Sequence, residues 1–165
     1  MSVVACRING DGIELSADSI CVQGYTQEKT SGKFAKLFEV ADMVIGGVGL
    51  ASENVLMQVF ALTHKPASPT EADMVVFLSE FSAWKKARTD KFDMENDFIF
   101  AFEGKAFRTN GFSIKEVMDY TAIGAGMDFA LAALYLEHGT VKAVETACEL
   151  SVYCERPVIT KRVQR

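Results

Sequence analysis

Residues 1–18 read MSVVACRINGDGIELSAD, and this stretch predicts a β-hairpin at the start of the chain. Residues 3–6 form a short apolar run, and the Asn-Gly-Asp-Gly sequence at residues 9–12 is typical of a turn. Residues 13–17 alternate between apolar and polar side chains, as a half-buried strand does. Ser2 therefore begins the first strand and Asp18 ends the second.

The rest of the chain alternates between groups of strands and groups of helices. Strands are predicted at residues 20–22, 34–40, 43–45, 98–102, 106–108, 120–123 and 158–160, with a polar loop over residues 24–32. Helical spacing of apolar residues predicts helices that begin near Ser52, Thr70, Gly124 and Thr140. This order favours an α+β fold, a four-layer αββα sandwich of two antiparallel sheets covered outside by two helix pairs.

Composition places the chain among ordinary globular domains. Its 165 residues fit a single domain over residues 1–165, and 49% of them are hydrophobic. The net charge of −5 and the sequence pI of about 5.1 argue against a nucleic-acid partner. The longest apolar run, at residues 43–51, is far below the roughly 18 residues of a membrane span. No membrane partner and no signal peptide are expected, since Arg7 interrupts the N-terminal apolar run.

Four cysteines and two histidines limit the chemistry that the chain can carry. Because none of the cysteines has C-x2-C spacing and no export signal is visible, reduced thiols in a cytoplasmic protein are expected. A catalytic triad built on histidine and a histidine-rich metal site are both disfavoured. The sequence therefore predicts no metal and no cofactor.

The N-terminus offers a different kind of catalytic group. Met1 precedes the small residue Ser2, so its removal would leave a hydroxyl and a free α-amine on one residue. An α-amine has an unperturbed pKa of about 7.7–8, which makes it a usable base near neutral pH. N-terminal hydroxyl nucleophiles use the amine in this way.

Several motifs together resemble those of one enzyme family. The chain carries Ser2 and Asp18, then KFAKL at residues 33–37, VIGG at residues 44–47 and IGAGMDFA at residues 123–130. This set is similar to the proteasome β-subunit and HslV family of N-terminal nucleophile (Ntn) hydrolases, above all to its short bacterial and phage-borne members. The resemblance covers nearly the whole chain, although residues 66–115 support it only by their pattern of elements.

The resemblance implies peptidase activity inside a self-assembled ring. Ser2 matches the nucleophile, Asp18 and Lys33 match the buried carboxylate and its lysine, and the Gly47 N–H matches the oxyanion donor. A lysine ammonium beside the α-amine would favour the neutral amine, since like charges disfavour protonation. The implied partners are a polypeptide substrate and further copies of the chain in stacked rings, and an ATP-dependent unfoldase stays open. The positions that match the first specificity pocket carry no charge: Cys21, Ser31, Ala35, Ile45 and Gly49.

The chain departs from the family pattern around the nucleophile. Ser2 replaces the usual threonine, and Ala125 stands where the family has a serine that hydrogen-bonds near the amine. Glu149 lies roughly where the family has an aspartate, and Ser151 and Val152 lie near its second serine. The polar network around the amine is therefore thinner than in the family.

Three functions stay open at this level. The intact set of Ser2, Asp18, Lys33 and Gly47 favours a peptidase of the threonine-peptidase type with serine as nucleophile. Ala125 favours a catalytically inactive subunit that still forms rings. An Ntn amidase for a small amide is the third, although no special cluster for a closed ligand pocket is visible.

Overall fold

The computed structural model describes residues 2–28 and 36–164. The first of its two main sheets consists of β1 (Val4–Asn9), β2 (Gly12–Ala17), β10 (Tyr120–Ile123) and β11 (Ile159–Gln164). The second consists of β5 (Leu37–Val40), β6 (Met43–Val48), β7 (Asp97–Phe102), β8 (Lys105–Asn110) and β9 (Ser113–Val117). The helices are α1 (Ala51–Ala61), α2 (Glu71–Thr89), α3 (Met127–Tyr135) and α4 (Thr140–Leu150).

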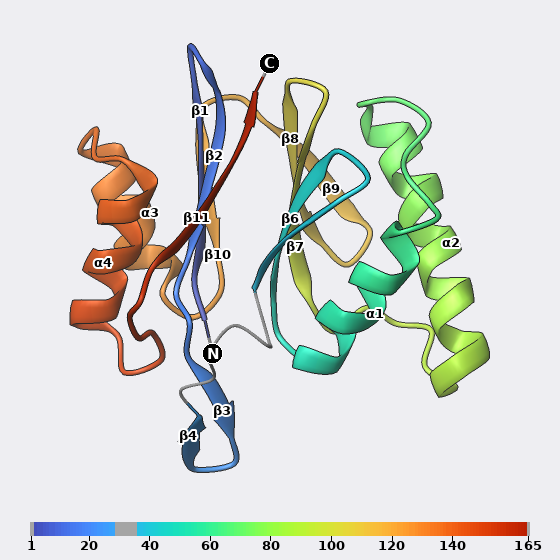
Figure 1. Cartoon of the computed structure of the whole chain (residues 1–165), viewed down its shortest axis with the longest axis horizontal. Coiled ribbons are helices and arrows are strands. Elements are labelled where there is room, and N and C mark those ends of the chain that lie inside the picture. The colour runs from blue at the N-terminus through green and yellow to red at the C-terminus, as the bar shows by residue number, and fades with distance from the viewer. Residues whose placement is uncertain (1, 29–35, 165) are drawn as a thin grey trace.

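These elements stack in four layers, as Figure 1 shows. The four-stranded sheet has the order β10-β1-β2-β11 and the five-stranded sheet the order β5-β6-β7-β8-β9, with antiparallel pairing throughout. Helices α3 and α4 cover the first sheet, and α1 and α2 cover the second (Figure 1). The predicted αββα fold class is therefore confirmed.

The predicted hairpin at the N-terminus is present with the expected register. Val4 pairs with Ala17 and Asn9 with Gly12, so the turn lies at one end of the β1–β2 pair. The other end brings the residues just outside the strands together, and the Asp18 N–H donates to the Val3 carbonyl at 3.3 Å. Both chemistry-bearing residues of the hairpin, Ser2 and Asp18, consequently lie at this second end.

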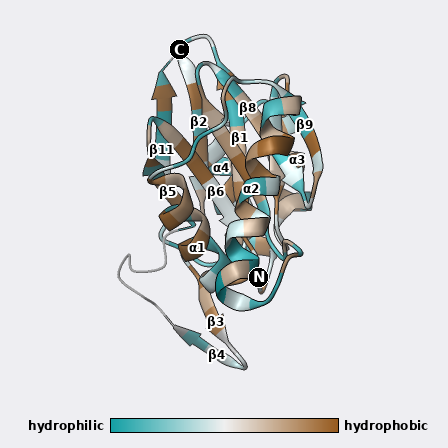
Figure 2. Ribbon diagram, turned by 90° about the vertical axis from the view of Figure 1, so that its right-hand side faces the viewer, coloured by the Kyte–Doolittle hydropathy of each residue, from teal (hydrophilic) through white to brown (hydrophobic). Residues whose placement is uncertain are grey.

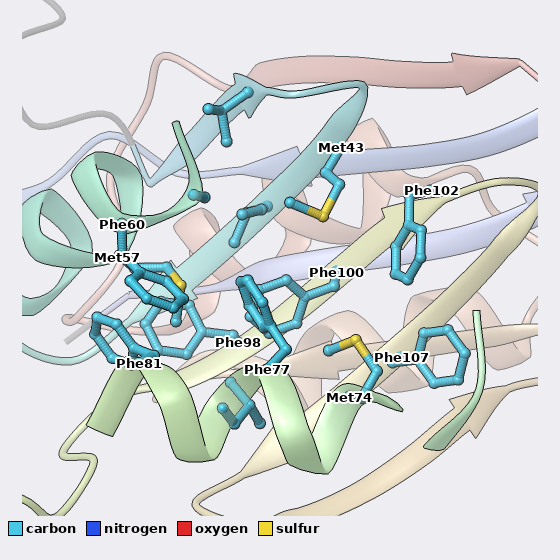
Figure 3. Packing of buried hydrophobic residues seen from close by; sticks show 14 of the residues in the cluster. Met43, Met57, Phe60, Met74, Phe77, Phe81, Phe98, Phe100, Phe102 and Phe107 are labelled. Carbon is cyan, nitrogen blue, oxygen red and sulfur yellow. The ribbon is translucent and has the colours of Figure 1, made fainter. Parts of the chain in front are cut away.

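The second sheet is bound to its helices by an aromatic core, shown in Figure 3. Phe60 of α1 packs against Phe77 and Phe81 of α2 with ring centroids 5.3 and 5.5 Å apart, and Phe77 meets Phe100 of β7 edge-on. Tilted aromatic pairs of this kind add to the free energy gained from burial alone. The methionine and aromatic residues at helical spacing in α2 therefore serve the core, as their pattern indicates.

The two sheets approach each other closely where β6 faces β1. A Cβ atom on Gly46 would lie 2.7 Å from a methyl group of Val4 and 2.9 Å from one of Leu37. Such distances are well inside van der Waals contact, so any larger residue at position 46 would push the sheets apart. Glycine here lets the end of β6 lie directly over the start of β1.

The sequence prediction missed two parts of the sheet structure and placed the start of one helix too early. A small hairpin of β3 (Cys21–Gln23) and β4 (Thr26–Glu28) occupies part of the predicted loop over residues 24–32. Its outer strand is exposed, so it lacks the apolar pattern on which the prediction depended. Strand β9 was not predicted for the same reason, since most of its side chains are not fully buried. The third helix begins at Met127, because Gly124 has a positive φ that ends the preceding strand in a turn.

Among the residues that the structure describes, no helix combines the length and the apolar content required to cross a membrane.

Candidate active site

Ser2 lies at the start of β1, enclosed by the turn that precedes α3. The residue is 4% exposed, and its carbonyl accepts a hydrogen bond of 3.2 Å from the Gly126 N–H. Gly124 has φ +96°, and a Cβ atom there would lie 2.4 Å from the Ser2 oxygen. Only glycine tolerates both this backbone conformation and this approach. The predicted Gly-Ala-Gly stretch thus fixes the first residues of the chain.

The Asp18 carboxylate is buried beside Ser2 and has four donors. One oxygen accepts from the Lys36 ammonium at 2.7 Å and from the Val3 N–H at 2.8 Å. The other accepts from the N–H groups of Ile20 and Glu155, each at 3.3 Å. A buried charge is costly unless it is paired and hydrogen-bonded, and this carboxylate is both. Through the Val3 N–H, this carboxylate binds the backbone directly after Ser2.

The lysine that contacts Asp18 in the described residues is Lys36. Its side chain is 8% exposed, and its Nζ forms the buried ion pair with Asp18. Burial lowers the pKa of Lys36, and the neighbouring Asp18 carboxylate partly opposes that effect. Lys33, to which the sequence interpretation gave this role, lies outside the described residues. The KFAKL motif contains both lysines, Lys33 and Lys36, and its spacing alone does not distinguish them.

The backbone N–H of Gly47 is already in use. It donates to the Lys36 carbonyl at 2.8 Å, which continues the β5–β6 pairing by one residue. Successive N–H groups of a strand point to opposite sides, so the Gly49 N–H points the same way as that of Gly47. Within residues 2–28 and 36–164, the Gly49 N–H has no hydrogen-bond partner, and Gly49 is exposed. Gly49 rather than Gly47 therefore presents a free donor on the side of Lys36.

Two asparagines hold the segment that contains this donor. The buried Asn96 side chain accepts from the Leu50 N–H at 2.6 Å and donates to the Leu50 carbonyl at 2.9 Å. Its amide nitrogen also donates to Asn54 at 2.9 Å, and Asn54 donates to the Gly47 carbonyl at 3.1 Å. We call this network the asparagine clasp. It fixes the backbone on both sides of Gly49. No sequence motif predicted this network.

The residues predicted for the specificity pocket lie on different elements. Cys21 is half-buried at the start of β3, and Gly49 lies at the exposed end of β6. Ile45 is fully buried in the aromatic core on the helix side of its sheet, away from Ser2. Ser31 and Ala35 lie outside the described residues. The expectation that Ile45 lines the pocket is not supported, because its side chain already packs within the core.

Comparisons with known proteins bear on the fold. No protein-family model and no curated protein matches the sequence. Among solved structures, BPH from Thiobacillus denitrificans, in complex with Epoxomicin, has a TM-score of 0.86 at 20% identity over 98% of both chains. Eukaryotic HslV from Trypanosoma brucei has a TM-score of 0.74 at 19% identity over 99% of both chains. Anbu (ancestral beta-subunit) from Yersinia bercovieri has a TM-score of 0.71 at 11% identity, covering 99% of this chain and 87% of its own.

The chain has the proteasome-like Ntn hydrolase fold. The predicted resemblance to this group is confirmed at the level of the fold, over nearly the full length of the chain.

Near Ser2, the Cys154 thiol lies beneath the turn that precedes α3. Glu149 is exposed and pairs with Arg156 at 2.9 Å, so it does not enter the site. A Cβ atom on Gly126 would lie 2.5 Å from the Cys154 sulfur, which places that thiol directly under the turn. Burial and the Asp18 charge raise the pKa of Cys154 to about 11. Cys154 is therefore a neutral thiol at physiological pH and not a competing nucleophile.

The described residues show no group of His, Cys, Asp and Glu side chains arranged to hold a metal ion. The chemistry derived below uses only the chain's own groups.

The asparagine clasp yields a stability prediction. Asn96→Ala would remove three part-buried hydrogen bonds to the Leu50 backbone and the Asn54 side chain, at a cost of about 2–3 kcal/mol in the free energy of unfolding. Urea denaturation measures this loss. Asn110→Ala is the matched control, since the exposed Asn110 side chain donates a single hydrogen bond, to Asp97, and should cost less than about 1 kcal/mol. Equal losses in the two variants would contradict the role given to the clasp.

Proposed function

We propose that the chain is a peptidase that cleaves peptide bonds with Ser2 as its N-terminal nucleophile, inside a ring of identical subunits. The observation that carries this proposal is the buried Asp18–Lys36 pair, hydrogen-bonded to the peptide N–H directly after Ser2. The pair lies beside Ser2, because one carboxylate oxygen binds both the Lys36 ammonium and the Val3 N–H. It supplies a fixed positive charge beside the amine that a mature N-terminus would expose.

Removal of Met1 is the first requirement of the mechanism. The new α-amine of Ser2 would act as the general base, because a nearby Lys36 ammonium disfavours its protonation. The amine takes the hydroxyl proton as the Ser2 oxygen attacks the carbonyl carbon of the scissile bond. The amine then gives this proton to the departing amino group as the C–N bond breaks, which leaves an ester on Ser2. Water hydrolyses the ester and restores the free hydroxyl.

The charge that develops on the attacked carbonyl oxygen needs a donor in a fixed position. The Gly49 N–H is the group we assign to this role, in place of the Gly47 N–H. Gly49 is exposed to an incoming substrate, its N–H points toward the side of Lys36, and the asparagine clasp holds the next residue. A donor of this kind typically contributes about 10²–10³-fold in rate, provided that it does not have to reorganise during the reaction.

The inactive ring subunit is the second candidate, and Ala125 favours it. Ala125 has no hydroxyl to share with the amine, and a neutral thiol, Cys154, lies beneath the same turn. The two candidates differ in a measurable way, since both would assemble but only one would process Met1 and react at Ser2.

The mass of the N-terminus and the binding of an inhibitor separate these two candidates. We expect the active protein to begin at Ser2 and to bind epoxomicin, the ligand in complex with the Thiobacillus denitrificans BPH. Intact mass before and after incubation measures both properties. A variant with an extra residue between Met1 and Ser2 serves as the control, because it keeps the fold but blocks the Ser2 amine. Retained Met1 on every chain of a preparation that still cleaves peptides would overturn the mechanism.

The second prediction separates the two candidate lysines. Lys36→Ala should lower the turnover of a fluorogenic peptide by about 10²–10⁴-fold, the range of a lost acid–base group. Lys33→Ala is the matched control and should stay within a few-fold of the unchanged protein. Because Lys36→Ala leaves Asp18 buried without a counter-charge, the double variant Asp18→Asn with Lys36→Met tests the same loss without that destabilisation. Loss of activity in Lys33→Ala alone would return the role to Lys33.

The pH profile gives an independent readout of the same lysine. Burial lowers the pKa of Lys36 below its ordinary value of 10.5, so the ammonium loses its proton at a lower pH than a surface lysine does. Activity that depends on this charge should therefore rise as the α-amine becomes neutral and fall again as the pH rises through the lowered Lys36 value, below 10.5. An alkaline limb that persists in Lys36→Ala would assign it to another group.

The third prediction concerns assembly. Val55, Val59 and Leu62 leave an apolar face of α1 between 43% and 65% exposed, which is a surface suited to contact with another subunit. We expect a mass of many chains by sedimentation at micromolar concentration and physiological salt. A mass equal to one chain under these conditions would count against the ring, without bearing on the chemistry of Ser2.

A further inference from the structure

Strands β8 and β9 present an unpaired basic hollow on the face that looks toward the other sheet. It has a volume of about 230 Å³ and is lined by Arg108, Asn110, Ser113 and Lys115. All four side chains can donate hydrogen bonds. Arg108 and Lys115 are direct cross-strand partners, as are Asn110 and Ser113, so the four groups form a regular block of two rows.

The two cations of this hollow have no acidic partner among the described residues. Neither Arg108 nor Lys115 takes part in any of the ion pairs there, and the Arg108 guanidinium reaches only the Met127 sulfur, at 3.9 Å. Two acids on these neighbouring strands have other partners. Asp97 accepts from Asn110 at 2.8 Å, and Glu116 pairs with Lys105 at the far end of the same strands.

Two like charges placed directly opposite each other across a strand pair are destabilising. In a chain with a net charge of −5, the absence of a compensating acid is a specific feature of this place rather than a shortage of acids. A bound anion would remove the repulsion. The planar guanidinium of Arg108 is suited to grip both oxygens of a carboxylate, and Lys115 would add a second charge.

The hollow lies on one flank of the candidate active site. Met127, which Arg108 contacts, follows the turn whose Gly126 N–H binds the Ser2 carbonyl. In the order β5-β6-β7-β8-β9, Lys36 adjoins β5 on one side of β6, while the hollow lies on the other side. Figure 2 shows β5 and β11 along one edge of the sandwich and β9 along the opposite edge.

The strand order gives the distance between the hollow and the end of β6. Strand β8 is two positions from β6, and strands lie about 4.8 Å apart, so the hollow is roughly 10 Å from the residues around Gly49. An extended peptide advances about 3.3 Å per residue. A substrate whose acyl part lies along Gly49 and Cys21 would therefore bring about its third residue beyond the cleaved bond to Arg108.

We propose that the hollow of Arg108 and Lys115 is a subsite for a carboxylate on the leaving side of a peptide substrate, about three residues after the scissile bond. The carboxylate can be an acidic side chain or the C-terminus of the peptide. This inference rests on the proposed peptidase function and gives the peptidase a substrate preference on the leaving side of the scissile bond.

Matched peptides test the subsite. Quenched fluorogenic peptides that differ only in Glu or Gln at the third position after the bond should differ about tenfold in kcat/KM, in favour of Glu, the scale of one charge-assisted interaction. A peptide amide and its free acid, both ending at that position, separate the side chain from the terminal carboxylate. The double variant Arg108→Gln with Lys115→Gln should equalise each pair. Lys105→Gln is the control, since Lys105 lies on the same strand but is paired with Glu116.

Three results would overturn the proposal: equal kcat/KM for Glu and Gln peptides in the unchanged protein, a preference that survives in the double variant, or an equal gain when the acid is placed before the bond. Binding of a labelled acidic peptide to Ser2→Ala, followed by fluorescence anisotropy, keeps this test apart from catalysis. If no peptide is cleaved but this binding is present and lost in the double variant, the peptidase proposal fails while the carboxylate site stands.

Discussion

The buried ion pair between Asp18 and Lys36 is the interaction on which the candidate site depends. Removing two charges from water is expensive, and such a pair is stable only when its remaining hydrogen-bonding capacity is filled. Here both carboxylate oxygens are occupied, by Lys36, Val3, Ile20 and Glu155. Those donors come from the start of β1, the segment after β2, the residue before β5 and the segment after α4. One carboxylate therefore ties four separate parts of the chain to the first residue.

A second constraint is space, which glycine supplies on both sides of Ser2. The end of β6 can lie over the start of β1 only because residue 46 has no side chain, and the turn before α3 can close on the Ser2 carbonyl only because residue 124 has none. These two approaches bring the free Gly49 N–H and the first residue of the chain into one region. The asparagine clasp then limits the freedom of the segment, which an exposed strand end would otherwise retain.

Much of this arrangement was predictable from the sequence because it follows from local patterns. The turn at residues 9–12 fixes the hairpin register, and that register alone places Ser2 and Asp18 together. The choice between Lys33 and Lys36, and between Gly47 and Gly49, depends instead on how β5 pairs with β6, which is a non-local register. A shift of one residue there changes which N–H groups are used within the sheet. Asn96 was beyond prediction, since it follows a loop whose fixed shape comes only from tertiary contacts.

A second buried ion pair supports the segment around Asn96. Glu53, in the first turn of α1, accepts from the Glu95 N–H and pairs with the buried Lys85, which also donates to the Asp93 carbonyl. The loop before β7 is thus held by a second buried ion pair, and Asn96 follows directly. Since Asn96 in turn holds Leu50, this second pair supports the backbone that follows Gly49. In the proposed mechanism, Ala125 and the neutral Cys154 thiol supply no hydroxyl group to the amine, and Lys36 is the group assigned to its electrostatic control. The rigidity of its frame then matters more than it would in a site with additional hydroxyl groups.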